Sequence, residues 1–247
     1  MFARLKNTFN KLTGGAHFKI PTPIEAKAVL LDLDGTLVDS APDLVAAANS
    51  VRVEMGLPTL DYATVVSFVG KGMEVLVHRT LTGQLNGQAD PAQLAKGLSI
   101  FKRVYSEING DQTTLYPGVR AGLEQMLDKG LQLGLVTNKP SQFTEALLLK
   151  KSLNNYFDVV VSGDTCAHKK PHPEPFLHAC RVLGIHVDQA VAIGDSLNDA
   201  QAARAAGLRV LGVPYGYNEG EAATSATLDV DGIVPSLVDA AKIIQTI

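Results

Sequence analysis

The sequence predicts an α/β fold in which a parallel sheet forms the core and a helical segment is inserted near its start. The first observation is a set of short apolar runs, each continuous enough to form a strand buried on both faces. The second is that amphipathic stretches separate the later runs, which is typical of parallel strands joined by helices. The runs lie at 28–31, 131–136, 159–161, 191–193 and 208–213.

Helical periodicity dominates the stretch between the first run and the others. Apolar residues recur there every three or four positions, and glycine-containing breaks separate the segments. We therefore expect a helical cap over residues 43–113 on an α/β core formed by residues 23–42 and 114–247. Ser40 and Asp43 are predicted to cap the first helix. The expected helices lie at 44–55, 62–69, 73–81 and 94–108, with hinges near 40–42 and 110–117.

Length and composition describe an ordinary globular protein. The 247 residues include 46% hydrophobic residues and carry a formal net charge of -3, so we expect no nucleic-acid partner. No apolar stretch is long enough to span a bilayer. Cys166 and Cys180 are not in a CxxC pair and favour a reducing, cytoplasmic location, with a single disulfide as the alternative.

Residues 1–22 form a separate basic N-terminal extension. Basic residues occur in it without an acidic one before residue 20, and apolar residues recur at helical spacing. A loosely docked terminus is favoured over attachment to a membrane surface or to a partner groove. The sequence leaves the oligomeric state open between monomer and homodimer.

Two carboxylates directly follow the first predicted strand. Asp32 and Asp34 are two residues apart, so in an extended chain they point to the same side and can reach one ligand. Gly35 then allows the chain to turn sharply. Such a pair can divide nucleophilic attack and proton transfer between its members. A strand-end turn is the structural alternative, but it requires only Asp34 and Gly35 and leaves Asp32 unexplained.

Polar side chains also follow the later strands, at the edge where the ligand crevice of an open parallel sheet lies. A turn explains Thr137 and Asn138 when each is taken alone. Helix capping by the segment after the fourth run explains part of Asp199, but it does not explain Asp195. The polar segments are 137–139, 169–175 and 194–199.

Charge arithmetic favours a bound cation at this edge. Two like charges about 4 Å apart cost on the order of 4 kcal/mol at an effective dielectric constant near 20, and Asp32, Asp34 and Asp195 are expected to crowd together. Carboxylate oxygens without cysteine or histidine select Mg²⁺, which usually bridges a carboxylate to a phosphate oxygen. A lysine in the proline-stiffened segment 169–175 and the hydroxyl of Thr137 complete a site for a phosphoryl group.

Four motifs occur in the order found in one large superfamily. They are DLDGTLVDS at 32–40, VTNK at 136–139, Lys170 within KKPHPEP, and GDSLND at 194–199. With this set the chain resembles the haloacid dehalogenase superfamily, and within it the bacterial phosphoglycolate phosphatases. The narrower likeness depends on the helical insertion, on the loop 69–72 and on the segment 212–218.

The resemblance implies a three-layered sandwich with a Rossmann-like sheet, and a Mg²⁺-dependent enzyme that hydrolyses a small phosphate ester, 2-phosphoglycolate. Asp32 is then expected to be the nucleophile, which forms an aspartyl-phosphate, and also a metal ligand. Asp34 is expected to protonate the leaving alkoxide and later to deprotonate water, with its backbone carbonyl as a second ligand. Asp195 is expected to complete the protein's share of the metal ligands.

The other motif residues are expected to hold the phosphoryl group. The resemblance gives hydrogen bonds from Thr137 and from the backbone amide of Asn138. It makes Lys170 the neutralising cation for the nucleophile and the developing charge, and Asp199 a residue that orients its neighbours.

In the cap, Lys71 is a candidate partner for the carboxylate of the substrate, and a flexible surface turn is an equal alternative. His78 and Arg79 are weaker candidates on a predicted helix.

Several functions share these residues. Other phosphatase, pyrophosphatase or phosphohexomutase activities use the same machinery, and a non-catalytic sensor or scaffold for phosphate ligands is an alternative of a different class. A binder, however, has no use for Asp34. Dehalogenation is excluded for a related reason, because halide leaves without a proton, whereas an alkoxide needs the one that Asp34 can supply.

Overall fold

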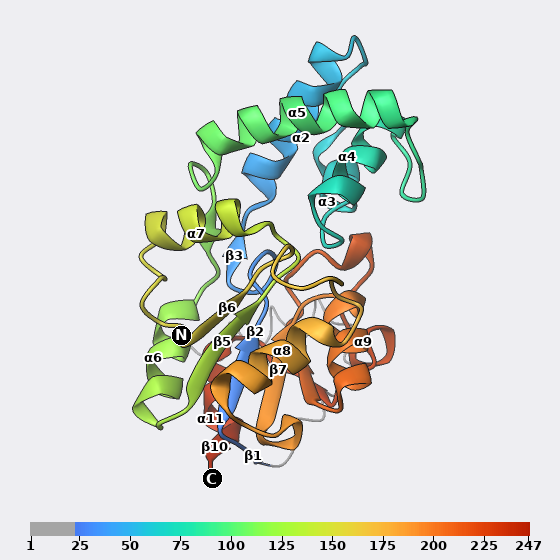
Figure 1. Cartoon of the computed structure of the whole chain (residues 1–247). Helices are drawn as coiled ribbons and strands as arrows, with labels where there is room; N and C mark the ends of the chain where they lie inside the picture. Colours follow the sequence, from blue (N-terminus) through green and yellow to red (C-terminus); the bar gives the residue numbers. More distant parts are fainter. Residues whose placement is uncertain (1–22) are drawn as a thin grey trace, which may run out of the picture.

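A six-stranded parallel sheet forms the centre of the protein (Figure 1). The structure is a computed structural model that describes residues 23–247, so the predicted basic extension 1–22 lies outside the described residues. The five predicted strands are present, and a short strand near the C-terminus adds a sixth. In sheet order the strands are β6 (Val159–Val161), β5 (Gln132–Val136), β2 (Ala28–Leu31), β7 (Ala190–Gly194), β8 (Arg209–Gly212) and β9 (Gly232–Ile233).

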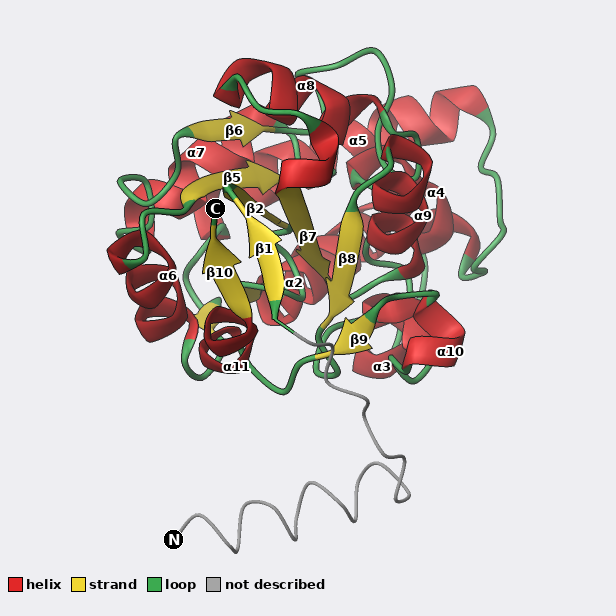
Figure 2. Cartoon of the chain, turned by 90° about the horizontal axis from the view of Figure 1, so that it is seen from below, coloured by secondary structure: helices red, strands yellow, loops and turns green. Residues whose placement is uncertain are grey.

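Helices cover both faces of this sheet, which explains why its strands are continuously apolar. All four residues of β2 are fully buried. One face packs against α8 (Glu174–Leu183) and α9 (Leu197–Ala206), and the other against α6 (Val119–Asp128) and α11 (Leu237–Ile243) (Figure 2). A strand between two helical layers meets no solvent and needs no polar alternation. The predicted three-layered α/β sandwich is confirmed.

Short elements complete the described core. β1 (Ile24–Ala26) pairs in parallel with β10 (Ile244–Thr246), so the two ends of the described chain lie side by side. The sequence does not indicate this pair, because strands of three residues carry too little pattern. The remaining core elements are α7 (Ser141–Lys150), α10 (Ser225–Leu228) and the 3₁₀ helices η1 (Val187–Gln189) and η2 (Asn218–Gly220).

Four helices lie together beyond the carboxyl ends of the strands (Figure 1). Their apolar faces meet in a hydrophobic cluster that is distinct from the two clusters on the faces of the sheet. Separate clusters support the proposed division into a core (23–42 and 114–247) and a cap (43–113). None of the helices in the described part of the chain is long and apolar enough to cross a membrane. The cap helices are α2 (Ala41–Glu54), α3 (Tyr62–Val66), α4 (Met73–Thr82) and α5 (Pro91–Ile108).

Local sequence fixes the ends of the cap helices. At the start of α3 the Asp61 carboxylate accepts a hydrogen bond from the amide three residues later, at 2.9 Å. Asp90 does the same for two amides at the start of α5, at 3.0 Å each. These contacts satisfy amides that have no partner within the helix. The left-handed Gly83 ends α4, as the glycine breaks predicted.

The chain crosses between core and cap twice, and the two crossings are bonded to each other. β3 (Val38–Asp39) leaves the core and pairs antiparallel with β4 (Thr114–Leu115), which re-enters it. The first crossing follows the turn that carries Asp34. The position of the cap is therefore connected to the site at the end of β2 through very few residues.

The fully buried Asp43 side chain, on α2, fixes the second crossing. Its carboxylate accepts hydrogen bonds from the amides of Gly110, Gln112 and Thr113 at 2.9 to 3.1 Å and from the Thr113 hydroxyl at 2.6 Å. The prediction that Ser40 and Asp43 cap α2 is wrong, because no side-chain cap hydrogen bond forms there. Backbone amides that are removed from water need hydrogen-bond acceptors. The hinge loop, residues 110–113, is not paired with a strand, so the Asp43 carboxylate supplies these acceptors.

We expect removal of this carboxylate to destabilise the protein. Asp43→Ala leaves the amides of the hinge loop without acceptors, and the free energy of unfolding should fall by about 3 kcal/mol. Chemical denaturation followed by circular dichroism measures the change. Asp111→Ala, in the same loop, removes an exposed carboxylate that pairs with Lys150 at the surface, and should lower it by less than about 0.5 kcal/mol. Equal losses in the two variants would contradict the role of Asp43.

Candidate active site

The candidate site lies where three neighbouring strands end. β2 lies between β5 and β7, and its last residue is in register with Leu135 and Ile193. Asp32, Thr137 and Asp195 follow these strands and meet at one edge of the sheet. The order of the strands along the chain reverses at β2, and open α/β sheets bind their ligands at such a point.

A tight turn brings Asp32 and Asp34 to one pocket. The amides of residues 36–38 all donate to the carbonyl of Leu33, and both carboxylates line the pocket. Gly35 has a φ angle of +92°, and a Cβ atom there would lie 2.3 Å from a carboxylate oxygen of Asp195. Glycine is therefore required twice, for the backbone conformation and for the space that Asp195 occupies.

Asp195 sits in a cradle built from backbone and one hydroxyl. Thr36 Oγ1 donates to its Oδ1 at 2.9 Å, and the amide of Tyr217 donates to its Oδ2 at 2.8 Å. On the side opposite Gly35, a Cβ atom at Gly216 would lie 2.1 Å from the Cβ of Asp195. The carboxylate is thus held between two glycines, Gly35 and Gly216, at a fixed position beside Asp32.

Lys170 joins the acidic groups. Its ammonium group donates to Asp32 Oδ1 at 2.7 Å, to Asp199 Oδ1 at 2.6 Å and to the carbonyl of Val136 at 2.6 Å. These three acceptors use all three of its N–H donors. Asp199 also accepts from the amide and hydroxyl of Ser196, so the predicted capping contact and a contact to the site coexist in one side chain.

The Asn138 side chain fixes the loop that carries Lys170. Its Nδ2 donates to the carbonyl of Lys170 at 2.9 Å, and its Oδ1 accepts from the Lys170 amide at 2.9 Å. The same Nδ2 donates to the carbonyl of Gly70, in the cap, at 3.0 Å. The structure therefore adds a positioning contact for Asn138 to the expected use of its backbone amide. Thr137 lines the pocket beside it.

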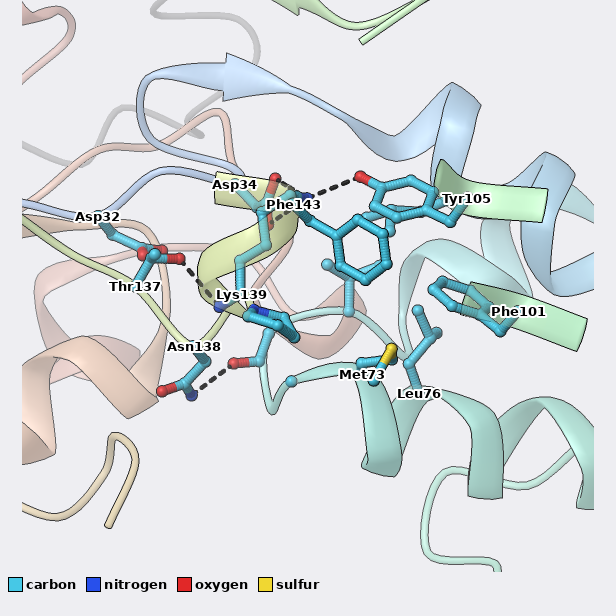
Figure 3. A pocket seen from close by; sticks show the side chains of 15 residues that line it. Asp32, Asp34, Met73, Leu76, Phe101, Tyr105, Thr137, Asn138, Lys139 and Phe143 are labelled. Atoms are coloured by element: carbon cyan, nitrogen blue, oxygen red, sulfur yellow. Dashed lines mark hydrogen bonds and ion pairs between the residues drawn. The ribbon is translucent and has the colours of Figure 1, made fainter. Parts of the chain in front are cut away.

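Lys139 and Ser40 contact Asp34, and Tyr105 contacts Lys139, although the sequence interpretation places none of the three in the site. Lys139 Nζ lies 3.1 Å from both Asp34 carboxylate oxygens and 2.7 Å from the hydroxyl oxygen of Tyr105 (Figure 3). Ser40 Oγ also donates to Asp34, at 2.6 Å. Lys139 is the last residue of the VTNK motif, and this position is the sequence signal that indicates a site residue. Tyr105 carries no sequence signal, because it belongs to the apolar stripe of α5.

Burial and charge oppose each other in this cluster. Burial, despite the attraction of Lys170, raises the pKa of Asp32 to about 7, and the nearby Asp199 adds to the rise. Burial, together with Asp199 and Asp32, raises the pKa of Asp195 well above its ordinary value. Burial alone would lower the pKa of Lys170, but the carboxylates of Asp199 and Asp32 outweigh it and raise that pKa. The carboxylates thus carry more negative charge than the lysine compensates.

The excess charge suits a divalent cation. Asp32, Asp195 and Asp199 each offer a carboxylate oxygen, and these oxygens lie within 4.8 Å of one another. The donors are all oxygen, which is the ligand type that Mg²⁺ and Ca²⁺ prefer. Asp199 already accepts three hydrogen bonds, which leaves Asp32 and Asp195 as the better ligands. The side chain of Asp34 is not part of this cluster.

The structure places Lys71 in a contact between the cap and the loop after β8 and not among the residues that line the pocket. Its ammonium group lies 2.9 Å from Glu219 Oε1, and the buried Arg79 binds the same oxygen at 2.5 Å. The neighbours Gly70 and Gly72 line the pocket, but Lys71 is not among the residues that line it. The three charged residues join the cap to the loop after β8.

The pocket is formed by core and cap together. The core contributes Asp32, Asp34 and the segment 137–140, and the cap contributes mainly apolar side chains. The polar end therefore lies at the sheet edge, and an apolar wall faces it (Figure 3). The apolar wall consists of Leu44, Val69, Met73, Leu76 and Phe101 of the cap with Phe143 of α7.

Comparisons with known proteins identify relatives that are phosphatases. A family model described as haloacid dehalogenase-like hydrolase matches residues 29–213. The chain is 50% identical over 223 residues to a phosphoglycolate phosphatase of Nitrosospira multiformis, a match that covers 90% of this chain and 97% of that protein. It is 44% identical over 222 residues to a phosphoglycolate phosphatase of Thiobacillus denitrificans, again covering 90% and 97%.

A solved structure agrees in three dimensions. The structure described as a predicted phosphoglycolate phosphatase from Haemophilus somnus matches with a TM-score of 0.82 and 32% sequence identity, covering 88% of this chain and 97% of that chain. The family match 29–213 starts in β2, spans the cap and contains all four motifs. The chain therefore belongs to the haloacid dehalogenase-like hydrolase family.

Proposed function

We propose that this protein is a Mg²⁺-dependent phosphatase that hydrolyses 2-phosphoglycolate to glycolate and phosphate through a phosphorylated Asp32. The observation that carries the proposal is that two carboxylates in one pocket have different partners. Asp32 is bonded to the fixed Lys170, whereas Asp34 is bonded to Lys139 and Ser40. The relatives described above bear the name of this substrate, which supports its choice.

The first step transfers the phosphoryl group to the protein. An Asp32 oxygen forms a bond to phosphorus while the bond between phosphorus and the ester oxygen of the substrate breaks. Asp34, in its protonated form, gives its proton to that oxygen, so that glycolate leaves with a neutral hydroxyl. Lys170 and Thr137 stabilise the charge on the phosphoryl oxygens. Since Lys170 is held by three acceptors, little reorganisation is needed.

The second step returns the protein to its starting state. A water oxygen attacks the phosphorus of the aspartyl-phosphate, and Asp34, now deprotonated, takes a proton from that water. The bond between phosphorus and the Asp32 oxygen breaks, which releases phosphate and restores the Asp32 carboxylate. Asp34 is again protonated, so the cycle is balanced.

Asp32, Asp195 and the backbone carbonyl of Asp34 are the proposed Mg²⁺ ligands. A Mg²⁺ ion held by these ligands would supply positive charge to the transferring phosphoryl oxygens. The cradle around Asp195 supports this assignment, because it holds one carboxylate at a fixed distance from the nucleophile. Asp199 is proposed to position Lys170 rather than to bind metal.

A cytoplasmic location and a small-molecule substrate belong to the same proposal. Neither Cys166 nor Cys180 is in a disulfide, which supports a reducing compartment over the alternative of a single bridge. Other phosphatase, pyrophosphatase or phosphohexomutase activities are the nearest rivals. Phosphate release across a panel of small phosphate esters separates them, because a mutase forms an isomer, and a non-catalytic binder releases no phosphate.

Substitution of the nucleophile is expected to abolish turnover. Asp32→Asn removes the oxygen that attacks phosphorus, so kcat should fall by at least about 10³-fold. The melting temperature should not drop, because the substitution removes a buried charge that burial disfavours. Phosphate release and thermal denaturation measure the two effects. A folded variant with near-normal activity would refute the covalent mechanism.

Substitution of the proton donor should depend on the leaving group. Asp34→Asn is expected to lower kcat/KM for 2-phosphoglycolate, which reports the steps up to release of the leaving group, by about 10² to 10⁴-fold. The loss should be smaller for 4-nitrophenyl phosphate, whose phenolate leaves without a proton. Steady-state kinetics with both esters gives the comparison. An equal loss for both esters would argue against proton transfer to the leaving oxygen.

Metal affinity is expected to depend on pH. Burial raises the pKa of Asp32 to about 7, so below pH 7 Mg²⁺ must displace a proton from this carboxyl group. The affinity for Mg²⁺ should therefore strengthen as the pH rises from 5.5 to 7.5, and chelation should remove activity that Mg²⁺ restores. Isothermal titration calorimetry at several pH values measures this. An affinity independent of pH would contradict ligation by Asp32.

A further inference from the structure

The two proposed steps give the buried ammonium group of Lys139 no part beyond its contact with Asp34. Lys139 is 5% exposed and lines the pocket beside Asp34. Lysine is rarely buried to this extent without a function or a partner. Among the described residues that line the pocket, Lys139 is the only lysine or arginine.

We propose that Lys139, assisted by the hydroxyl group of Tyr105, binds the carboxylate of the leaving group and so selects phosphate esters of short 2-hydroxycarboxylic acids. The inference rests on the proposed function of the site, because it concerns the same pocket and the same reaction. The core residue Lys139, and not the cap residue Lys71, is then the lysine that determines specificity.

Distance favours this assignment. A proton donor must come within about 2.6 to 3.2 Å of the ester oxygen. In a 2-hydroxycarboxylate the carboxylate is only two bonds from that oxygen, so it must also lie close to Asp34. Lys139 Nζ lies 3.1 Å from both oxygens of Asp34, which places its charge where the carboxylate has to arrive.

The hydrogen-bond capacity of the pair also fits. The Lys139 ammonium group has three donors. The Tyr105 oxygen accepts one, and a single donor shared between two equidistant oxygens is enough for Asp34, so a third can face the substrate. Within residues 23–247 the Tyr105 hydroxyl has no acceptor for its own hydrogen, which is therefore free to bind a carboxylate oxygen.

No other described residue that lines the pocket offers a second negative charge a cationic partner. The wall of the pocket is apolar, and an unpaired carboxylate against such a wall is strongly disfavoured. The cap cations Lys71 and Arg79 are bound to Glu219. A leaving group with more carbons between its hydroxyl and its carboxylate would place that carboxylate beyond Lys139, against Met73 and Phe101.

The test compares two esters that differ only in the carboxylate. Ethyl phosphate replaces the carboxylate of 2-phosphoglycolate by a methyl group. The measured quantity is the ratio of kcat/KM for 2-phosphoglycolate to kcat/KM for ethyl phosphate, with Mg²⁺ present. In Lys139→Met this ratio is expected to fall by about 100-fold, as for loss of one partner of a buried charge pair. Tyr105→Phe should lower it by a smaller factor.

Lys71→Met is the matched control, because it makes the same change at a lysine bound to Glu219. Its ratio should stay within about twofold of the unmodified protein. Lys139→Arg retains the charge and should keep more of the ratio than Lys139→Met. It also provides the comparison if Lys139→Met does not fold.

Each alternative result has a distinct meaning. If Lys139→Met lowers kcat/KM for both esters equally, the lysine only positions Asp34 and the inference is wrong. If Lys71→Met collapses the ratio instead, the carboxylate binds at the cap loop and the inference is again wrong. If the unmodified protein releases phosphate from other esters but not from 2-phosphoglycolate, the proposed function fails first, and this comparison identifies that failure separately.

Discussion

The ammonium group of Lys170 is the contact on which the arrangement of the site depends. Its three acceptors come from three segments: the end of β5, the turn after β2 and helix α9. No donor remains, so each bond fixes the other two. One ammonium group nevertheless serves a cluster of three carboxylates, the half-buried Asp32 and the buried Asp195 and Asp199, and their desolvation raises the pKa of Asp32 and Asp195. The deficit of positive charge makes this cluster receptive to a divalent cation.

The acidic cluster has room only because the residues packed against it are glycines, which have no side chain. A Cβ atom at Gly194 would lie 2.4 Å from the Asp199 side chain, and one at Gly163 would lie 2.2 Å from the carbonyl of Asn138. Gly35 and Gly194 let strands and loops approach the acids more closely than any larger residue permits, and Gly163 lets the loop after β6 approach Asn138. The motif glycines are thus part of the electrostatics, because they set how near the charges lie.

The sequence predicts the fold and the gathering of acidic residues at one sheet edge, because both depend on local patterns. Buried strands are continuously apolar, and Asp32, Asp34 and Asp195 stand directly at strand ends. What it misses depends on contacts distant in sequence. Tyr105 reaches Lys139 only when α5 folds over the sheet, and Asp43 bonds to residues about 70 positions away rather than to its own helix. Neither contact leaves a periodic signal.

The loop after β8 shows why the two halves of the site cannot be placed independently. The Tyr217 amide holds Asp195, and the Tyr217 hydroxyl accepts hydrogen bonds from the first crossing at 2.8 and 3.0 Å. Two residues later Glu219, in a left-handed conformation with φ of +52°, binds Lys71 and Arg79 of the cap. That conformation costs about 1 kcal/mol for a residue with a side chain, so the ion pairs must offset it. A shift of the cap displaces this loop and the crossing that follows the turn of Asp34, so the geometry of the acids follows the geometry of the cap.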